Sequence, residues 1–418
     1  MTEKLLQYIW QFQCYNTNSL TTADGESLQI IYPGQHNTNQ GPDFLNAKIC
    51  VNSTTWAGNI ELHVKSTEWL SHKHSEDKNY NNVILHVVWQ DDMRLDLPFP
   101  VLELQSKVSK LLLSKYDELM LAGTFISCEK NIHQVENLIW IAWKERLLVE
   151  RLQNKAAAIN AYLTCNKNNW EETFWWILAR NFGIKVNAVL FEKIAQSLPL
   201  SIISKHKSQI HQLEALLFGQ AGLLEKKLQE AYPVMLQKEY RYLKKLYALQ
   251  QLTIQPHFLR MRPANFPTIR LAQLAMLLHQ SHHFFSKMKE AVSVTELRLL
   301  LDITANDYWH YHFVFDEESG YKEKHLGNQM ISNLIINAVV PTVFAYGLHN
   351  DEQVYKDKAI SWLQELAPEK NNVTAGFELL QIKNGSAFDS QALIQLKNEY
   401  CILKRCLECA IGNKLIKK

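Results

Sequence analysis

The sequence lacks the features that mark secreted, membrane-inserted and strongly charged proteins. Its formal net charge is only +2 over 418 residues, so no overall electrostatic field singles out a nucleic-acid or membrane binder. The seven cysteines, an odd number at irregular spacing, argue against the disulfide framework of a secreted domain. The first residues, MTEKLLQYIW, include an acidic side chain and no apolar segment of signal-peptide type. We therefore expect a cytoplasmic protein kept in a reducing environment.

One apolar stretch, residues 330–348, has to be considered as a membrane span. It contains Asn333, Asn337 and Pro341, and polar groups of this kind are costly in hydrocarbon. The better prediction is a buried core helix, so we expect no membrane partner. Nothing in the sequence indicates an oligomeric state.

Charge is divided unevenly along the chain. Residues 1–100 hold 6 Lys and Arg against 11 Asp and Glu, a net −5, which leaves +7 for the remainder. An acidic N-terminal part suits a metal site, and a mildly basic remainder suits a surface that holds anions such as nucleic acid. Ordinary sampling also produces asymmetry of this size.

Hydrophobic periodicity divides the chain near residue 125. Before that point the pattern predicts helix, strand, strand, strand, a polar helix or ordered loop, and strand, at residues 4–12, 28–32, 44–51, 56–65, 68–80 and 83–89. Prolines restrict residues 95–104 to an edge strand. Helices are predicted afterwards, at residues 135–162, 170–182, 209–217, 223–252 (kinked or split by Pro233) and from about 327. The sequence therefore predicts an α+β protein, with a mixed-sheet domain at 1–125 and a larger helical domain at 126–418.

A predicted hairpin in the first domain brings ionisable side chains together. Glu61, His63 and Lys65 alternate along one strand and share one face. A two-residue turn at Asn52-Ser53 places Glu61 opposite Phe44, and so beside Asp43. A turn one residue later separates the two carboxylates by a further ~3 Å, but leaves them at the same end of the hairpin.

Two carboxylates at one end of a hairpin are a usual way to hold Mg²⁺ or Mn²⁺. We expect Asp43 and Glu61 to be the metal ligands, with His63 or Lys65 orienting water or stabilising developing charge. The alternative interpretation is a solvated sheet face next to a turn aspartate.

Further histidines allow a different metal. His72, His74, Asp77 and His86 could form a Zn²⁺ site with His63. Most such histidines are structural or lie at the surface, and His86 falls in a predicted core strand. If the domain is catalytic, His72 or His74 is a better candidate for a general acid than for a ligand.

The cysteines offer a second potential metal site. Cys401, Cys406 and Cys409 have C-x4-C-x2-C spacing, and Cys128 could be a distant fourth ligand for an iron–sulfur cluster or Zn²⁺. Packed thiols on a C-terminal helix are the alternative interpretation, because cysteine is among the most readily buried residues.

Two resemblances bear on these residues. Gly41-Pro42-Asp43 followed by Glu61-Leu62-His63 resembles the Asp and Glu-x-Lys motifs of the PD-(D/E)XK nuclease-like superfamily, which implies a core of helix, three strands, helix and strand. His63 stands at the lysine position of that motif, and the lysine comes two residues later, as Lys65. The segments NQGPDF, WAGNIELHVKSTEWLSHKH, RPANFPTIRLAQLA and CILKRCLECAIGN resemble an uncharacterised bacterial family, domain of unknown function 2851.

Three functions follow as hypotheses. The first is a metal-dependent phosphodiesterase of nuclease-like fold acting on nucleic acid, with Asp43 and Glu61 as metal ligands and His63, Lys65 and His74 in catalytic roles. The second is a non-catalytic interaction protein whose nuclease-like domain is degenerate. The third is a hydrolase whose zinc is held by histidines.

Overall fold

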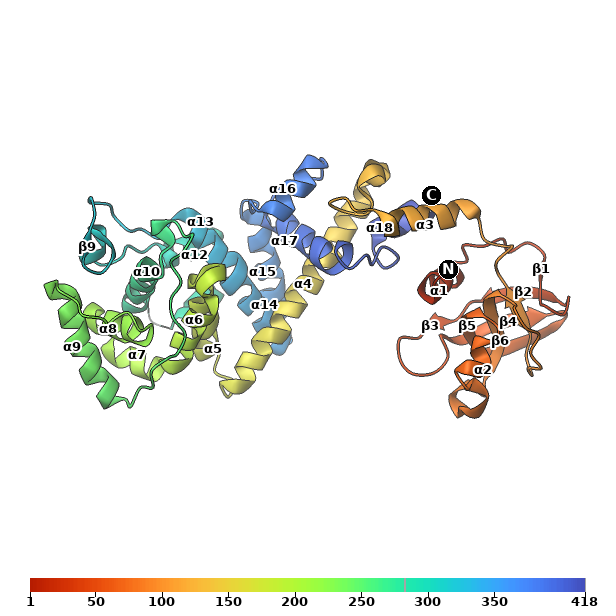
Figure 1. Cartoon of the computed structure of the whole chain (residues 1–418), viewed down its shortest axis with the longest axis horizontal. Helices are drawn as coiled ribbons and strands as arrows, with labels where there is room; N and C mark the ends of the chain where they lie inside the picture. Colours follow the sequence, from red (N-terminus) through yellow and green to blue (C-terminus); the bar gives the residue numbers. More distant parts are fainter. Residues whose placement is uncertain (282, 418) are drawn as a thin grey trace. The chain divides into compact units, whose positions relative to one another are not determined.

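A computed structural model describes residues 1–281 and 283–417 (Figure 1). The chain forms two compact units, Met1–Trp143 with Leu396–Lys418 (unit 1) and Lys144–Gln395 (unit 2). Unit 1 contains a mixed sheet and unit 2 is mainly helical, which confirms the α+β fold class. Unit 1 extends past the predicted boundary at residue 125, because the last residues of the chain return to it.

Unit 1 is built on one sheet with short helices. Its strands are β1 (Leu20–Thr21), β2 (Ser27–Tyr32), β3 (Gln35–His36), β4 (Phe44–Val51), β5 (Thr54–Lys65), β6 (Val83–Gln90) and β7 (Val101–Glu103). Its helices and single helical turns are α1 (Glu3–Gln11), α2 (Glu68–Ser71), η1 (His74–Glu76), η2 (Lys78–Tyr80), α3 (Lys110–Leu121), η3 (Glu129–Gln134), η7 (Leu396–Cys401) and α18 (Ala410–Lys417).

Helix α4 (Asn137–Cys165) leads from unit 1 into unit 2. The remaining helices are α5 (Trp170–Phe182), α6 (Ile184–Ser197), α7 (Leu200–His206), α8 (Ile210–Gln220), α9 (Ala231–Leu246), η4 (Pro263–Asn265), α10 (Pro267–Gln280), α11 (Phe284–Glu290), α12 (Val294–Leu301), η5 (Asp307–His310), α13 (Asn328–Leu334), η6 (Ile335–Val339), α14 (Val340–His349), α15 (Gln353–Glu365), α16 (Asn372–Leu379) and α17 (Ala387–Gln395). A small hairpin joins β8 (His312–Val314) to β9 (Glu317–Glu318).

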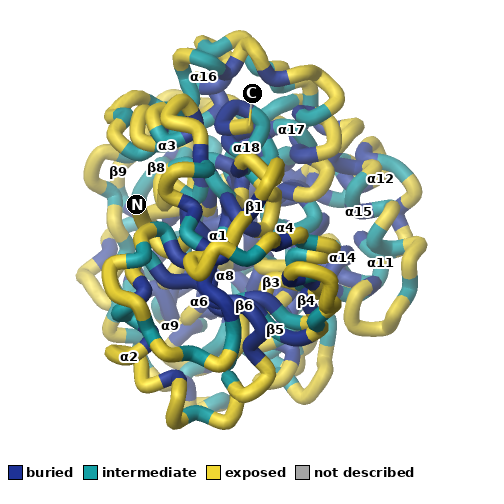
Figure 2. Tube along the Cα trace, turned by 90° about the vertical axis from the view of Figure 1, so that its right-hand side faces the viewer, coloured by how far each residue is buried: buried dark blue, intermediate teal, exposed yellow. Residues whose placement is uncertain are grey.

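The sheet of unit 1 runs in the order β1-β2-β4-β5-β6-β7, with β3 paired to β4. Its first four strands are antiparallel neighbours, whereas β5, β6 and β7 are parallel. Strand β6 is buried over most of its length and β5 from Ile60 to His63, and Figure 2 shows buried segments beside both labels. Ile60 and Leu62 point into the core that Leu6 and Ile9 of α1 cover. Glu61 and His63 therefore point to the opposite face.

The parallel pairing of β5 and β6 decides what covers that opposite face. Parallel neighbours cannot be joined by a tight turn, so the chain needs a crossover. Residues 66–82 form it, and they contain α2, η1 and η2. Trp69 of α2 is buried against the rings of His86 and Phe99, which anchors the crossover over the sheet. The polar segment predicted at 68–80 is thus the lid of this face.

The hairpin register differs from the prediction in one respect. The Asn52-Ser53 turn is confirmed, because Val51 pairs with Thr54. A bulge then shifts the register between Ala47 and Phe44, so Phe44 faces Ile60 and Glu61 comes opposite Asp43. Asn46 in the bulge has a left-handed backbone with φ of 57°, a conformation that asparagine tolerates better than most residues. The bulge brings the two carboxylates closer than a regular ladder does.

Unit 2 follows the helical pattern of the sequence closely. Helix α5 occupies the predicted 170–182 and ends at Gly183. Pro233 neither kinks nor splits α9, because it lies in the first turn of the helix, where its missing N–H costs nothing. Residues Asn328–His349 are long and apolar enough to cross a membrane, but 72% of their most apolar window is buried inside the protein. That burial fits the prediction of a core helix.

Candidate metal centre on the sheet of unit 1

Four donor atoms converge on the covered face of the sheet. His63 Nε2 lies 3.1 Å from His72 Nδ1 and 3.3 Å from His74 Nε2. Glu61 Oε1 lies 3.4 Å from His74 Nε2 and 3.7 Å from His63 Nε2. The three imidazole nitrogens lie within 4.8 Å of one another, and Glu61 Oε1 adjoins two of them. We call these four residues the histidine site.

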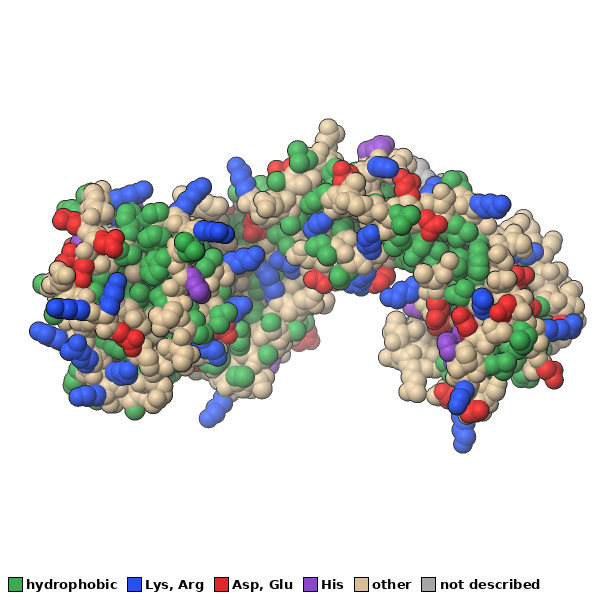
Figure 3. All heavy atoms as spheres, viewed as in Figure 1, with side chains coloured by type: hydrophobic (Ala, Val, Ile, Leu, Met, Phe, Trp, Pro, Cys, Tyr) green, Lys and Arg blue, Asp and Glu red, His purple; other side chains and the backbone are tan. Residues whose placement is uncertain are grey.

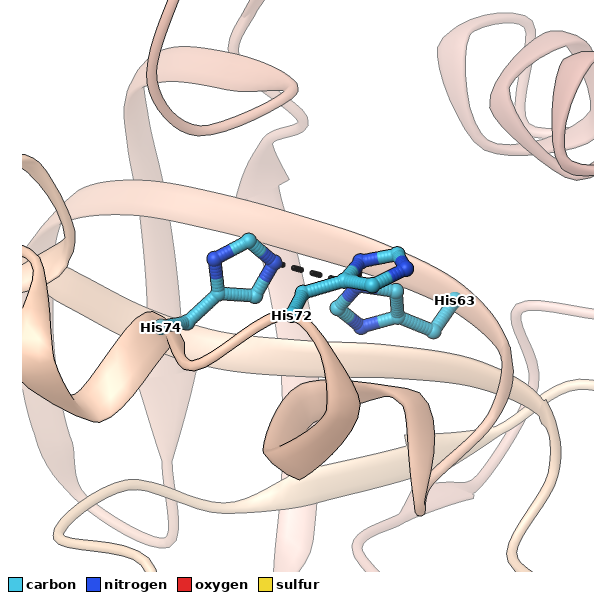
Figure 4. Close-up of side chains that lie close together, drawn as sticks. All are labelled: His63, His72 and His74. Atoms are coloured by element: carbon cyan, nitrogen blue, oxygen red, sulfur yellow. Dashed lines mark hydrogen bonds between the residues drawn. The ribbon is translucent and has the colours of Figure 1, made fainter.

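The sheet and the crossover each supply part of the histidine site. Glu61 and His63 alternate along β5, whereas His72 and His74 come from the crossover (Figure 4). Between the two crossover histidines, Lys73 adopts a left-handed backbone with φ of 56°, which ends α2 and starts η1. This reversal turns both imidazoles toward β5. A non-glycine residue in this conformation is uncommon away from functional sites and turns.

Further side chains hold the four donors in place. His86 Nε2 lies 2.8 Å from His63 Nδ1, so the ring of His63 is fixed by its second nitrogen. Asp43 N–H donates to Glu61 Oε2 at 3.0 Å, and the Asp43 carboxylate accepts from Leu62 N–H at 3.1 Å. The other oxygen of Asp43 accepts from Gln7 of α1 at 2.8 Å. Oε1 of Glu61 is therefore left facing the imidazoles.

Burial sets the protonation states of these groups. It lowers the pKa of His63 to about 2, helped by the neighbouring imidazoles, and it lowers the pKa of His86 to about 3. His74 shifts in the same direction for the same reason. Burial also raises the pKa of Glu61 and of Asp43 well above the usual carboxyl range; repulsion from Asp43 adds to the shift of Glu61, and repulsion from Glu3 adds to that of Asp43. The site therefore presents neutral imidazoles at His63 and His74, and carboxyl groups that ionise readily only beside a cation.

The donor geometry fits a transition-metal ion. A ring nitrogen can form one hydrogen bond, as donor or as acceptor. His63 Nε2, however, lies within 3.3 Å of two other ring nitrogens and also close to Glu61 Oε1. Two nitrogens bound to one tetrahedral Zn²⁺ at about 2.0–2.1 Å are about 3.3 Å apart, which matches the separations found here. Among the described residues, the buried Nδ1 atom of His86 has no hydrogen-bond partner. The His86 ring therefore contacts the site through Nε2, which orients His63.

The site is covered on most sides but reaches solvent at one. His63 is 1% exposed, whereas His72 is classed as exposed. Trp69 packs edge-on against His74, and Tyr80 stacks on the same ring with a centroid distance of 3.9 Å. Figure 3 shows histidine and acidic side chains together at the surface of the unit that carries the sheet. A small molecule or a terminal group of a larger one can therefore approach from the His72 side.

The structure brings most, but not all, of the predicted site residues together. Glu61, His63 and His74 join the site directly, and Asp43 adjoins it through hydrogen bonds to Leu62 and Glu61. Lys65 points elsewhere: its side chain is 54% exposed, and its ammonium lies 3.9 Å from Asp92.

Other sequence candidates fall outside the donor set or in a second cluster. Asp77 accepts from Asn79 N–H as the cap of η2, although its charge still acts on His74. The four cysteines line one small cavity elsewhere in unit 1.

Three contributors were not found from the sequence. Gln7 lies on a helix whose pattern indicates only an apolar face, and nothing local connects it to Asp43. Trp69 and Tyr80 looked like ordinary members of a polar segment. The spacing of Trp69, His72 and His74 around a potential helix end was the only available signal.

Comparison with known proteins gives a single match. A family model described as protein of unknown function (DUF2851) matches residues 3–372. No curated protein and no solved structure matches the chain. The matched range includes the whole histidine site and stops before Cys401.

Proposed function

The chain belongs to the family of proteins of unknown function DUF2851, and from this starting point we propose that it is a metal-dependent hydrolase. Its cation would be a zinc-type divalent ion held by His63, His72 and His74, which leaves a fourth position for water beside Glu61. The observation that carries the proposal is the grouping of three imidazole nitrogens within 4.8 Å of one another, with the Glu61 Oε1 atom 3.4–3.7 Å from two of them. This was the third of the hypotheses formed from the sequence.

The donor types favour a zinc-type ion over Mg²⁺. Imidazole suits Zn²⁺, Fe²⁺ and Ni²⁺, whereas Mg²⁺ prefers carboxylate, carbonyl and water oxygens. Both Asp43 oxygens already accept hydrogen bonds from Gln7 and Leu62, which leaves them less available to a hard cation. Asp43 is therefore assigned a positioning role in place of the ligand role predicted from the sequence.

Each remaining residue has a distinct task. His86 holds the orientation of His63 through the 2.8 Å contact between their ring nitrogens. Asp43 presents Glu61 by donating its backbone N–H to Oε2. Trp69 and Tyr80 exclude water from the buried side of His74. A bound zinc-type ion supplies Lewis acidity and lowers the pKa of water, which is the chemistry of hydrolysis at neutral pH.

Phosphodiesters are the substrate class to test first. The order α1, β2, β4, β5, α2, β6 follows the helix, three strands, helix, strand arrangement that the PD-(D/E)XK resemblance implies. The side-by-side placement of Asp43 and Glu61 across β4 and β5 supports the same comparison. A Mg²⁺- or Mn²⁺-dependent phosphodiesterase at these two carboxylates is the second candidate function, on that observation.

The test combines metal analysis with hydrolysis assays. Metal content per chain is measured by plasma mass spectrometry for wild type, Asp43→Ala, Glu61→Ala, His72→Ala and His74→Ala. The surface control is His133→Ala, which alters an exposed histidine of the same unit. The proteins are then assayed on bis-p-nitrophenyl phosphate, DNA and RNA oligonucleotides and p-nitrophenyl acetate, with Zn²⁺, Mn²⁺ or Mg²⁺ added.

The outcomes separate the candidates. A bound zinc-type ion and a hydrolytic activity that both disappear in His72→Ala and His74→Ala, but persist in His133→Ala, support the proposal. Activity with Mg²⁺ that needs Asp43 and Glu61 but survives His72→Ala favours the second candidate. A folded wild type that binds no divalent ion at these residues rejects both, and leaves the non-catalytic interaction protein.

A further inference from the structure

The second cluster of metal-ligating side chains lies in unit 1, apart from the histidine site. Cys128 precedes η3, while Cys401, Cys406 and Cys409 belong to the C-terminal segment. All four line one small cavity with a volume of about 20 Å³. We call these four residues the cysteine site. We propose that the cysteine site is a four-thiolate metal centre that ties the C-terminal segment to the rest of unit 1.

The local fold aims the thiols at the shared cavity. Cys409 immediately precedes α18, where the backbone N–H groups of Ile411 and Gly412 are potential donors to its sulfur. Ser127 lines the same cavity as Cys406 and offers a hydroxyl donor. Hydrogen bonds to sulfur stabilise thiolates and are a common feature of thiolate–metal centres.

Gly412 shows how closely the segment is folded on itself. A Cβ atom at this position would come within 2.4 Å of the Cys406 carbonyl oxygen, so only glycine lets α18 approach the Cys406 backbone. That approach brings Cys406 and Cys409 to the same cavity. The close packing is specific to the turn that carries the last two thiols.

The four thiols are close to one another in a largely buried environment. Cys406 and Cys409 are buried, and all four cysteines are free of disulfides. Burial raises the pKa of Cys128 to about 12 and of Cys409 to about 11, and the neighbouring thiols raise both further. Cys401 shifts in the same direction, with Cys409, Cys128 and Cys406 all contributing.

Two thiophilic centres share this chemistry. Four thiolates are a usual ligand set for structural Zn²⁺, and the four cysteines that line this small cavity supply that set. The C-x4-C-x2-C spacing with a distant fourth cysteine is also that of plant-type iron–sulfur proteins. The experiment therefore determines which metal is bound, whereas the proposal is that these four cysteines are its ligands.

The full-length chain is purified without oxygen from cells supplied with iron and zinc. Iron, zinc and acid-labile sulfide per chain are measured with the visible spectrum, for wild type and for Cys128→Ser, Cys401→Ser, Cys406→Ser and Cys409→Ser. Cys50→Ser and Cys165→Ser are the matched controls, because neither residue lines the cavity. His63→Ala removes the metal of the histidine site and isolates the contribution of the cysteines.

In the His63→Ala background we expect about one metal centre per chain, reduced at least tenfold by each of the four cavity substitutions and unchanged by the two controls. Iron with sulfide and visible absorbance identifies a cluster, and zinc alone identifies a single-ion centre; both support the four-thiolate site. A folded chain without either metal, or a Cys128→Ser variant that keeps the full amount, overturns it.

A measurement on the unmutated chain covers the case in which variants fail to fold. Reactive thiols are titrated with and without a strong chelator while circular dichroism monitors helix content. We expect four thiols to become reactive only after chelation. Equal reactivity before and after chelation contradicts the proposal. The result does not depend on the proposed hydrolase activity, because the two donor sets share no residue.

Discussion

The histidine site is made by one continuous stretch of chain, residues 61–74, whereas the cysteine site joins Cys128 to a segment near the C-terminus. The first uses nitrogen and oxygen donors and reaches solvent at His72. The second uses four sulfur donors around a small cavity. Catalytic metal sites keep a position open, while structural sites are closed by protein ligands. Under the two proposals, the histidine site would carry out chemistry and the cysteine site would stabilise unit 1.

The largest effect is expected on metal affinity and activity when a ligand of the histidine site is removed. His63→Ala removes the nitrogen nearest to both His72 and His74, so metal affinity and hydrolytic activity should fall by more than about 100-fold, the upper range for losing a mere supporting residue. Melting temperature should change far less. Calorimetric metal titration and differential scanning calorimetry check this. A His63→Ala variant that keeps its metal affinity would show that the metal is not bound at the histidine site.

The opposite pattern is expected for the cysteine site. Cys409→Ser should lower the melting temperature of unit 1 by about 10 °C, because losing a metal–thiolate centre costs several kcal/mol and each 1 kcal/mol shifts a unit of this size by about 2–4 °C. Metal affinity at the histidine site should stay the same. Cys165→Ser, at an exposed position, should leave the melting curve unchanged. Equal melting curves for all three proteins would remove the structural role.

A positioning residue should give an intermediate effect. His86→Leu takes away the 2.8 Å contact that orients His63 and should weaken metal binding about 10- to 100-fold without changing metal stoichiometry. His86→Gln, which retains a hydrogen-bonding group, should recover part of the loss. Competition with a chromogenic chelator measures both affinities. Identical values for the leucine variant and wild type would show that His86 is only a core residue.

Metal binding should also depend on pH in a particular direction. Burial raises the pKa of Glu61 above its ordinary value of 4.5, so at neutral pH the metal-free site holds a proton that a bound cation must displace. Burial keeps His63 and His74 neutral, so they release none. Affinity should therefore rise about tenfold per pH unit through neutral pH. Titration calorimetry in buffers of different ionisation enthalpy measures the proton, which should be absent in Glu61→Gln.

The smallest effect is expected at the lysine that follows the motif. Lys65→Ala should change activity and stability little, because an exposed ammonium 3.9 Å from Asp92 contributes about 0–1 kcal/mol. Steady-state kinetics and a urea melt test this. A large loss of kcat would return Lys65 to the catalytic role predicted from the sequence.

Local patterns in the sequence were enough to predict most elements. Alternation placed β4 at residues 44–51, and the apolar run placed β6, because strand periodicity reports which residues face a core. Helix α5 ended at the glycine that marks its stop. The Asn52-Ser53 turn set the hairpin, but the bulge at Asn46 gave no sequence signal, since asparagine is common in ordinary loops.

The site was only half predictable. Glu61 and His63 were found because two ionisable residues on one strand face stand out against an apolar alternation. The proposal follows the zinc alternative, with His63 and His74 as ligands, and gives Asp43 the role of supporting Glu61 through its backbone N–H. No local pattern could show that, because hydrogen bonds from Gln7 and Leu62 occupy the Asp43 carboxylate only after α1 and β5 pack together.

By itself the sequence determined the family, the α+β division and the chemistry available to each segment, because these depend on residue types and local periodicity. Tertiary structure alone decided which of those side chains meet. A parallel pairing of β5 and β6 forces the intervening residues across the sheet, and this lays His72 and His74 on His63. The return of the C-terminal segment likewise delivers three thiols to Cys128. Both groups of side chains come together through long-range packing, which no short stretch of sequence specifies.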